Sequence, residues 1–168
     1  MRWLVATLLC AIMVAPVAAS TSRSVDEAIK QDPRMAIVKR FMRLDLSKKA
    51  LLDFKGDGTR DLVLYGQFKA GLSGSGPRYR IHNFSDMPEN RIEQGEYGLA
   101  IVPAYEGGSV IFSMLGEVEL FEPYIRGKLK DPECWSRRAR KDALYVGYAG
   151  VGGVIFYSGG WRWRQCGE

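Results

Sequence analysis

The sequence predicts an α+β fold that is mainly antiparallel β and forms one small domain. Three observations predict it. A helix-start signal and an amphipathic stretch stand near the N-terminus, short apolar runs between glycine-rich turns fill the chain from residue 51 onward, and the C-terminal part alternates strands with tight turns. Such a sheet must bury one face, and the N-terminal helix is the element expected to cover it.

Residues 1–19 have the layout of a cleavable secretory signal. Arg2 precedes an apolar run from Trp3 to Val14, Pro16 breaks this run, and small residues precede Ser20. The run is shorter than the roughly 20 apolar residues that span a bilayer. We therefore expect a mature domain of residues 20–168 in the periplasm or outside the cell, without a membrane span.

Two helices are expected after the leader. Ser24 and Glu27 have the spacing of a capping box, in which each side chain accepts a backbone N–H of the other residue. Asp32 can cap a second helix that has Pro33 at its first position and runs to about Arg43. Apolar side chains of this amphipathic helix share faces in two pairs: Ile37 with Phe41, and Val38 with Met42.

Strands are predicted where short apolar or alternating runs end at glycine or proline. They cover residues 62–65, 79–84, 99–102 and 109–115, and a flexible loop is expected over 70–77. Residues 129–141 are polar and basic, which predicts a long surface loop that carries Cys134.

A three-stranded meander is predicted at the C-terminus, with strands over 143–148, 154–157 and 161–164. Because side chains alternate along a strand, Trp161, Trp163 and Gln165 face one way. Arg162, Arg164 and Cys166 then face the other way. We expect the tryptophans in the core and the arginines in water.

Removal of the leader leaves two cysteines, Cys134 and Cys166. An even pair in an exported protein predicts a disulfide. The chain has no Cys-x-x-Cys spacing, so the sequence gives no support to a redox centre or a thiolate zinc site.

The segment from Asp53 to Leu62 is the motif that carries chemistry, with the sequence Asp-Phe-Lys-Gly-Asp-Gly-Thr-Arg-Asp-Leu. Carboxylates at the first, fifth and ninth places of a glycine-containing loop can converge on one cation, and calcium prefers six to eight oxygen ligands. Asp53, Asp57 and Asp61 would supply side chains, and Thr59 a backbone carbonyl.

This run resembles the calcium loop of FG-GAP and VCBS repeats, whose pattern is Asp-x-Asn-x-Asp-Gly-x-x-Asp-Leu entering a strand. The wider sequence is similar to small, largely uncharacterised periplasmic proteins with a single such loop, in which a Gly-Leu-x-Ile-Val-Pro segment (here Gly98 to Pro103) and an Asp-Ala-Leu strand start (here Asp142 to Leu144) accompany it. The resemblance implies location and architecture more than activity. One copy of the loop cannot close a β-propeller.

Lys55 departs from this pattern, because the family has Asn or Asp at the third place. A lysine at this place supplies no oxygen ligand, and its ammonium repels a metal ion. Alternatively, the ammonium takes the place of the cation among the carboxylates. A third interpretation is a hairpin turn in which Asp side chains bond to nearby backbone groups.

Catalytic groups are scarce. His82 is the single histidine, so histidine triads and multi-histidine zinc sites have too few partners. A carboxylate pair of the glycosidase kind is the remaining catalytic option. Nothing singles out a pair among the candidates, which are Glu93, Glu96, Glu117, Glu119 and Glu122.

A basic patch is the last candidate feature. The sequence has 24 Lys and Arg against 19 Asp and Glu, and its net charge is +5. The predicted disulfide would gather six basic residues on one side of the sheet: Arg137, Arg138, Arg140, Lys141, Arg162 and Arg164. Export makes nucleic acid an unexpected partner and favours an envelope protein or an anionic envelope component.

The leading functional hypothesis is a non-catalytic, exported interaction domain with a degenerate calcium-type loop. An inhibitor or immunity protein for a cell-wall-degrading enzyme is a concrete form of it. The alternative is an envelope hydrolase that uses paired carboxylates. The sequence gives no oligomeric state.

Overall fold

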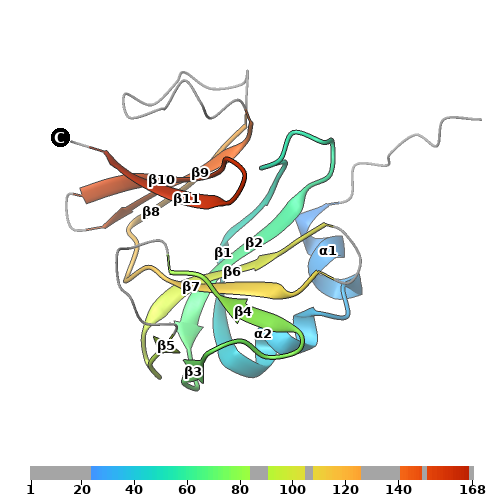
Figure 1. Ribbon diagram of the computed structural model, residues 1–168, viewed down its shortest axis with the longest axis vertical. Coiled ribbons are helices and arrows are strands. Elements are labelled where there is room, and N and C mark those ends of the chain that lie inside the picture. The colour runs from blue at the N-terminus through green and yellow to red at the C-terminus, as the bar shows by residue number, and fades with distance from the viewer. Residues whose placement is uncertain (1–23, 84–90, 105–107, 126–140, 149–150, 167–168) are drawn as a thin grey trace, which may run out of the picture.

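The computed structural model describes residues 24–83, 91–104, 108–125, 141–148 and 151–166. In these residues, two short helices are followed by eleven strands (Figure 1). The predicted fold class is confirmed, because the chain is mainly β, the pairing is mostly antiparallel and the helices lie at the N-terminal end. The predicted leader, residues 1–19, lies outside the described residues.

Helix α1 spans Val25–Gln31, and its predicted capping box is confirmed. The Ser24 hydroxyl accepts the N–H of Glu27 at 3.2 Å, and the Glu27 carboxylate accepts the N–H of Ser24 at 2.9 Å. These bonds satisfy two of the N–H groups that a helix start leaves without an internal partner.

Helix α2 spans Met35–Phe41 and is shorter than predicted. Its N-cap is Arg34, not Asp32, because the Asp32 carbonyl accepts the N–H of Met35 at 3.0 Å in a tight turn before the helix. The C-terminal end is also earlier than Arg43, since Met42 already has extended backbone angles. Val38 is buried on the helix, whereas Met42 is buried as the first residue of the strand that follows.

The central sheet has five strands in the order β1-β2-β6-β7-β4. They are β1 (Met42–Leu52), β2 (Asp61–Phe68), β6 (Tyr97–Val102), β7 (Val110–Met114) and β4 (Tyr79–Ile81). Neighbours are antiparallel except β4, which is parallel to β7. Strand β1 carries a bulge, because its register jumps from Asp45 opposite Tyr65 to Lys49 opposite Leu64.

The second sheet has four strands in the order β11-β10-β9-β8. The predicted C-terminal meander is confirmed as β9 (Ala143–Tyr148), β10 (Val151–Tyr157) and β11 (Trp161–Cys166). Strand β8 (Leu120–Tyr124) extends it by one strand. Two further short strands, β3 (Leu72–Ser73) and β5 (Arg91–Ile92), pair with each other in the segment between β2 and β6.

Three layers result, with the central sheet in the middle. One face of β2 carries Leu62 and Leu64, which belong to the same core cluster as the helix residues Met35 and Val38. The other face carries Val63 and Tyr65, which pack in a second cluster with residues of the four-stranded sheet, including Leu144 and Ile155. The central sheet is therefore buried on both faces.

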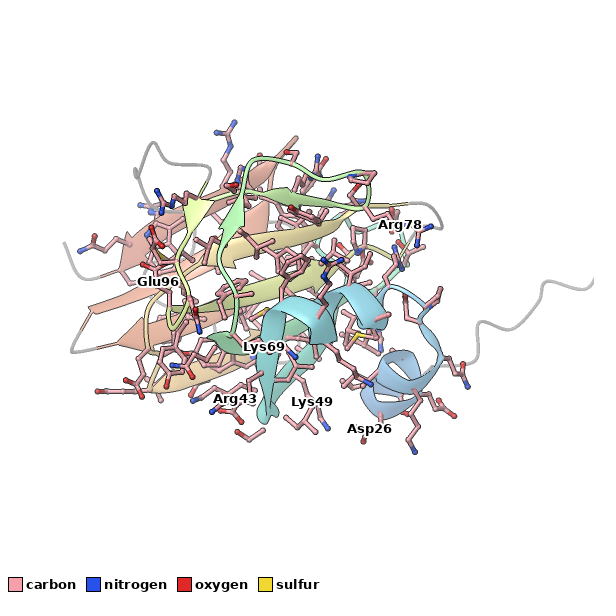
Figure 2. All side chains as sticks on the ribbon, turned by 90° about the horizontal axis from the view of Figure 1, so that it is seen from below. Asp26, Arg43, Lys49, Lys69, Arg78 and Glu96 are labelled. Atoms are coloured by element: carbon pink, nitrogen blue, oxygen red, sulfur yellow. The ribbon has the colours of Figure 1, made fainter. Side chains whose placement is uncertain are left out.

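Ion pairing adds to the contact between α1 and the sheet edge. Asp26 of α1 and Lys49 of β1 lie 2.7 Å apart, and Figure 2 shows the helices covering the sheet on this side. The loop between β1 and β2 lies at the end of the sheet that approaches β10 and β11 (Figure 1).

Candidate functional site

The loop of residues 53–60 joins β1 to β2 and is organised around one carboxylate. Asp53 Oδ1 accepts the N–H of Gly56 at 2.6 Å and that of Asp57 at 3.2 Å, and Asp53 Oδ2 accepts the N–H of Gly58 at 3.0 Å. Three consecutive backbone N–H groups thus surround this carboxylate. The loop behaves as an anion-binding turn that its own first residue fills.

Asp57 makes a second, smaller turn on the exposed side of the loop. Its Oδ1 accepts the Thr59 N–H at 2.9 Å and also the Thr59 hydroxyl. The hydroxyl bond, followed by the backbone bond, lowers the pKa of the Asp57 carboxyl, and the charge of Lys55 adds to this effect. Asp57 therefore stays ionised while it braces the loop.

Asp61 ends the loop at the first position of β2, and its carboxyl group lies in the protein interior. Its Oδ1 accepts the Ala104 N–H at 2.8 Å. Burial raises the pKa of this carboxyl, and the charges of Asp57 and Asp53 add to the rise, whereas the bond from Ala104 and the charge of Lys55 oppose it.

The three carboxylates predicted to hold calcium therefore each accept hydrogen bonds from different backbone N–H groups. No group of three or more His, Cys, Asp or Glu side chains is placed to hold a metal ion within the part of the chain that the structure describes. The Lys55 ammonium lies 5.9 Å from the centre of the Tyr157 ring. The arrangement matches the hairpin-turn interpretation, in which Asp side chains bond to the backbone.

Phe54 and Asp142, which the sequence analysis did not single out as site residues, fix the loop to the second sheet. Phe54 is fully buried and meets Trp161 edge to face, with 4.7 Å between ring centres. The Asp53 N–H donates to Asp142 Oδ2 at 2.9 Å, and the Asp142 N–H donates to the Asp53 carbonyl at 3.2 Å. An apolar Phe54 inside a polar loop was the signal for this anchor.

The basic patch is described in part. Arg162 and Arg164 are exposed on β11, whereas Trp161 is buried and Trp163 half-buried, so the predicted alternation is confirmed. Arg137, Arg138 and Arg140 lie outside the described residues. The predicted disulfide stays a prediction, since Cys134 also lies outside them.

Lys141 connects the patch to the loop. A Cβ added at Gly56 would lie 3.0 Å from Lys141 Cγ, so the aliphatic part of this lysine lies directly over the loop backbone. Gly56 also has a φ of +70°, which favours glycine. Two segments that are distant in the sequence thus share one surface.

The remaining catalytic candidates are a histidine bonded to a backbone carbonyl and glutamates at the surface. His82 Nε2 lies 3.2 Å from the Trp161 carbonyl oxygen, which gives the histidine a bonding role between β4 and β11. Glu93, Glu117, Glu119 and Glu122 are exposed, and Glu96 is half-buried.

Comparisons with known proteins give no relative: no protein-family model, no curated protein and no solved structure matches this chain. Among the described residues, the helices are too short and too polar to span a membrane.

Proposed function

We propose that this protein is an exported, non-catalytic binding domain, and that the loop of residues 53–60 presents its recognition surface. The observation that carries this proposal is an exposed but braced loop. Five consecutive residues, 56–60, are exposed, while Asp53, Phe54 and Asp61 hold the loop from within. A loop that is already ordered loses little conformational entropy when a partner binds.

The charges around the loop favour an acidic partner. Lys55, Arg60 and Lys141 flank the loop, and Asp57 is the exposed acid among them, already bonded to Thr59. Enzymes that cleave cell-wall glycans carry a pair of carboxylates in their clefts. The cations on and beside this braced loop are complementary to such a cleft, which supports an inhibitor or immunity protein of a cell-wall-degrading enzyme.

A charge-reversal variant tests this proposal. The variant combines Lys55→Glu, Arg60→Glu and Lys141→Glu, and a control variant combines Lys39→Glu, Arg43→Glu and Lys69→Glu. The control residues are exposed and lie on α2, on β1 and after β2, and Figure 2 shows Arg43 and Lys69 on the helix side. The measurement is the rate of peptidoglycan hydrolysis by envelope extract, with the wild-type protein or either variant added.

We expect the wild-type protein and the control variant to slow hydrolysis at similar concentrations. The loop variant should need about tenfold more protein or worse, because charge pairs at an interface steer and hold the partner. Salt should weaken the wild-type effect, since exposed charges are screened over about 8–10 Å at ordinary ionic strength. Equal inhibition by both variants would reject the loop as the binding surface, and no inhibition by the wild type would reject the inhibitor role.

Calcium binding by the loop is a separate proposal, carried by the resemblance to calcium loops. If calcium binds, its addition raises the melting temperature of the wild-type protein, and Asp57→Ala removes this rise. The braced carboxylates favour the turn interpretation, in which calcium changes the melting temperature of neither the wild type nor Lys55→Asn. A third result is that calcium changes nothing in the wild type while Lys55→Asn becomes sensitive to it. That result would show that Lys55 takes the place of a cation.

A further inference from the structure

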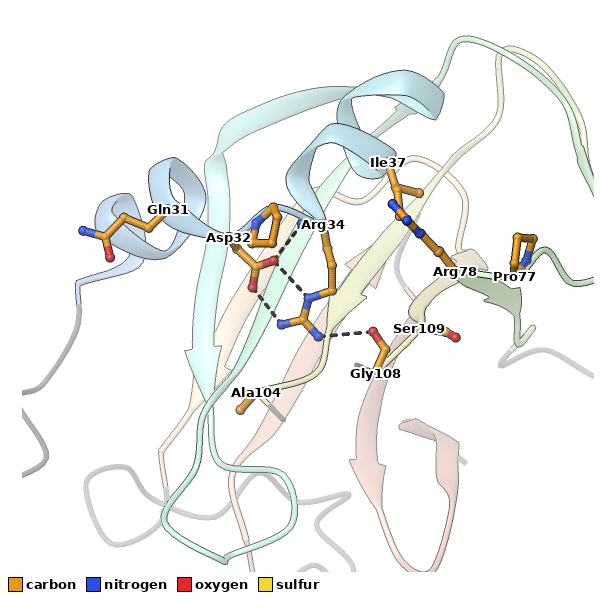
Figure 3. A pocket seen from close by; sticks show the side chains of 10 residues that line it. Gln31, Asp32, Arg34, Ile37, Pro77, Arg78, Ala104, Gly108 and Ser109 are labelled. Atoms are coloured by element: carbon orange, nitrogen blue, oxygen red, sulfur yellow. Dashed lines mark hydrogen bonds and ion pairs between the residues drawn. The ribbon is translucent and has the colours of Figure 1, made fainter. Parts of the chain in front are cut away.

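A pocket opens on the helix side of the central sheet, between the start of α2, the start of β4 and the connection from β6 to β7 (Figure 3). Its volume is about 690 Å³. Sites for small molecules have volumes of roughly 300–1,000 Å³. None of the loop residues 53–60 lines this pocket, so it is separate from the proposed recognition surface.

Arg34 forms a fixed wall of the pocket. Its Nε and Nη2 donate to the two oxygens of Asp32 at 2.9 and 2.7 Å, and its Nη1 donates to the Gly108 carbonyl at 3.2 Å (Figure 3). The side chains of Arg34 and Asp32 are only 18% and 12% exposed. The bond to Gly108 links the start of α2 to the connection before β7, and the ion pair sets the charge of Asp32 against that of Arg34.

Arg78 has a different environment. It lines the same pocket from the start of β4, its side chain is exposed, and within the described residues its guanidinium makes no hydrogen bond or ion pair. The same holds for the hydroxyl of Ser109, which is half-buried. Ser109 lies beside Arg78, since the N–H of the next residue, Val110, donates to the Arg78 carbonyl at 3.0 Å. Because Asp32 is paired with Arg34, the described residues of the lining carry one net positive charge, that of Arg78.

We propose that this pocket binds a small organic carboxylate. The planar guanidinium of Arg78 can donate two parallel hydrogen bonds to a carboxylate, and the Ser109 hydroxyl can donate to a further oxygen. The apolar side of the ligand would lie on the apolar lining residues, which include Ile37, Pro33 and Pro77. The single negative charge of a carboxylate matches the net charge of the described lining residues, whereas a phosphate monoester carries about 1.5 to 2 negative charges.

The contrast between the two arginines makes the proposal testable without unfolding the protein. Arg34 is built into the fold by its hydrogen bonds to Asp32 and Gly108, whereas an exposed arginine without a partner contributes little to stability. Arg78→Ala should therefore keep the melting temperature of the wild type. Arg80→Ala is the matched control, since Arg80 is an exposed arginine on β4 that does not line the pocket.

The test is an NMR titration of the labelled protein with paired probes. N-acetylphenylalanine represents a peptide C-terminus and glucuronate a sugar acid, while N-acetylphenylalaninamide and glucose are their neutral counterparts. Glucose 6-phosphate tests the phosphate source. We expect at least one carboxylate to shift the amide signals of Ile37 and Ser109, and to bind more tightly than its neutral counterpart and glucose 6-phosphate.

Arg78→Ala should weaken this binding about tenfold or more, which is the effect of losing a charge-assisted pair of hydrogen bonds, and Arg80→Ala should bind like the wild type. Four results would overturn the proposal: no shift with either carboxylate, equal binding of the neutral probe, tighter binding of glucose 6-phosphate, or unchanged binding by Arg78→Ala. Inhibition of peptidoglycan hydrolysis should be the same for Arg78→Ala as for the wild type, so failures of the two proposals are distinguishable.

Discussion

Asp61 places a carboxyl group inside the protein at the point where the loop rejoins the sheet. The residue is 2% exposed and accepts one backbone N–H, from Ala104. Burial is the main cause that raises the pKa of this carboxyl. When the pKa of a group is higher in the folded than in the unfolded state, the folded state binds its proton more tightly. The protonated group therefore contributes to the stability of the fold, and this contribution is lost as pH rises through the folded pKa.

Asp61→Asn should therefore stabilise the protein at about pH 7, where the wild-type carboxyl must be ionised in the interior. The amide oxygen that this substitution introduces can still accept the Ala104 N–H. At about pH 3 the wild-type carboxyl is protonated, and the advantage of the variant should disappear. Urea unfolding at the two pH values measures both free energies.

The matched control is Asp57→Asn. The bonds from Thr59 lower the pKa of Asp57, so this substitution should cost stability at neutral pH and cost less in acid, the opposite direction to Asp61→Asn. A difference between Asp61→Asn and the wild type that is equal at both pH values would contradict the role assigned to burial.

Sequence reasoning at the residue scale succeeded where alternation alone decides the outcome. Trp161 is buried and Arg162 exposed, as a half-buried strand requires. It was not decisive for Asp53, because the spacing of carboxylates is the same in a cation-binding loop and in a turn that bonds its own N–H groups. The deciding feature is which backbone N–H groups point inward, and the sequence does not contain it.

At the scale of the elements, two paired glycines let the central strands approach closely. Gly66 of β2 stands opposite Gly98 of β6. A Cβ at Gly98 would overlap the backbone carbonyl of Ser113 on β7, and a Cβ at Gly66 would overlap that of Arg43 on β1. The obstruction is backbone in both cases, so rotation of a side chain cannot relieve it.

Gly98→Ala should destabilise the protein by about 1–3 kcal/mol, because the added methyl group forces β6 and β7 apart in the middle of the core. Urea or thermal unfolding measures the loss. Gly160→Ala is the control, since a Cβ at Gly160 meets no atom within 4 Å. This variant should stay within about 0.5 kcal/mol of the wild type. Similar effects of the two substitutions would show that the close approach is absent.

The predicted strands that were confirmed are short apolar runs bounded by glycine or proline, such as β6 and β9. Strand β1 was missed. Its bulge between Asp45 and Lys49 inserts residues that have no partner on β2, and the period of two is lost across them. Strands β3 and β5 were missed as well, because each has only two residues and depends on a partner distant in sequence.

At the scale of the whole molecule, the order of the strands depends on contacts that no local pattern contains. Strand β2 pairs with β6, and β4 joins β7 in parallel, although other segments separate the members of each pair in the sequence. Three layers follow, because both faces of the central sheet are apolar and each must be covered. The C-terminal meander was predictable since its neighbours in sequence are also neighbours in space.

The predicted disulfide between Cys134 and Cys166 belongs to this scale. Cys166 ends β11, opposite Gly152, and packs against a small cluster on the outer face of the second sheet formed by Tyr124, Ala143 and Val154. A bond from Cys134 would tie the segment between β8 and β9 to the strand at the far edge of the same sheet. Closing a loop of this length stabilises the folded state by about 3–4 kcal/mol in the chain-entropy model.

Mass spectrometry of the protein purified without reductant should show both cysteines oxidised together, and reduction should lower the free energy of unfolding by about 3–4 kcal/mol. The double variant Cys134→Ser, Cys166→Ser should match the reduced wild type and should not respond to reductant. Strand β11 also carries Trp161, which packs against Phe54 and so anchors the loop. Loss of the disulfide should therefore weaken the inhibition of peptidoglycan hydrolysis. This effect is expected at temperatures where the disulfide-bonded wild type is still folded. Two free thiols in the exported protein, or equal stability with and without reductant, would rule out the bond and leave the second sheet to depend on its packing alone.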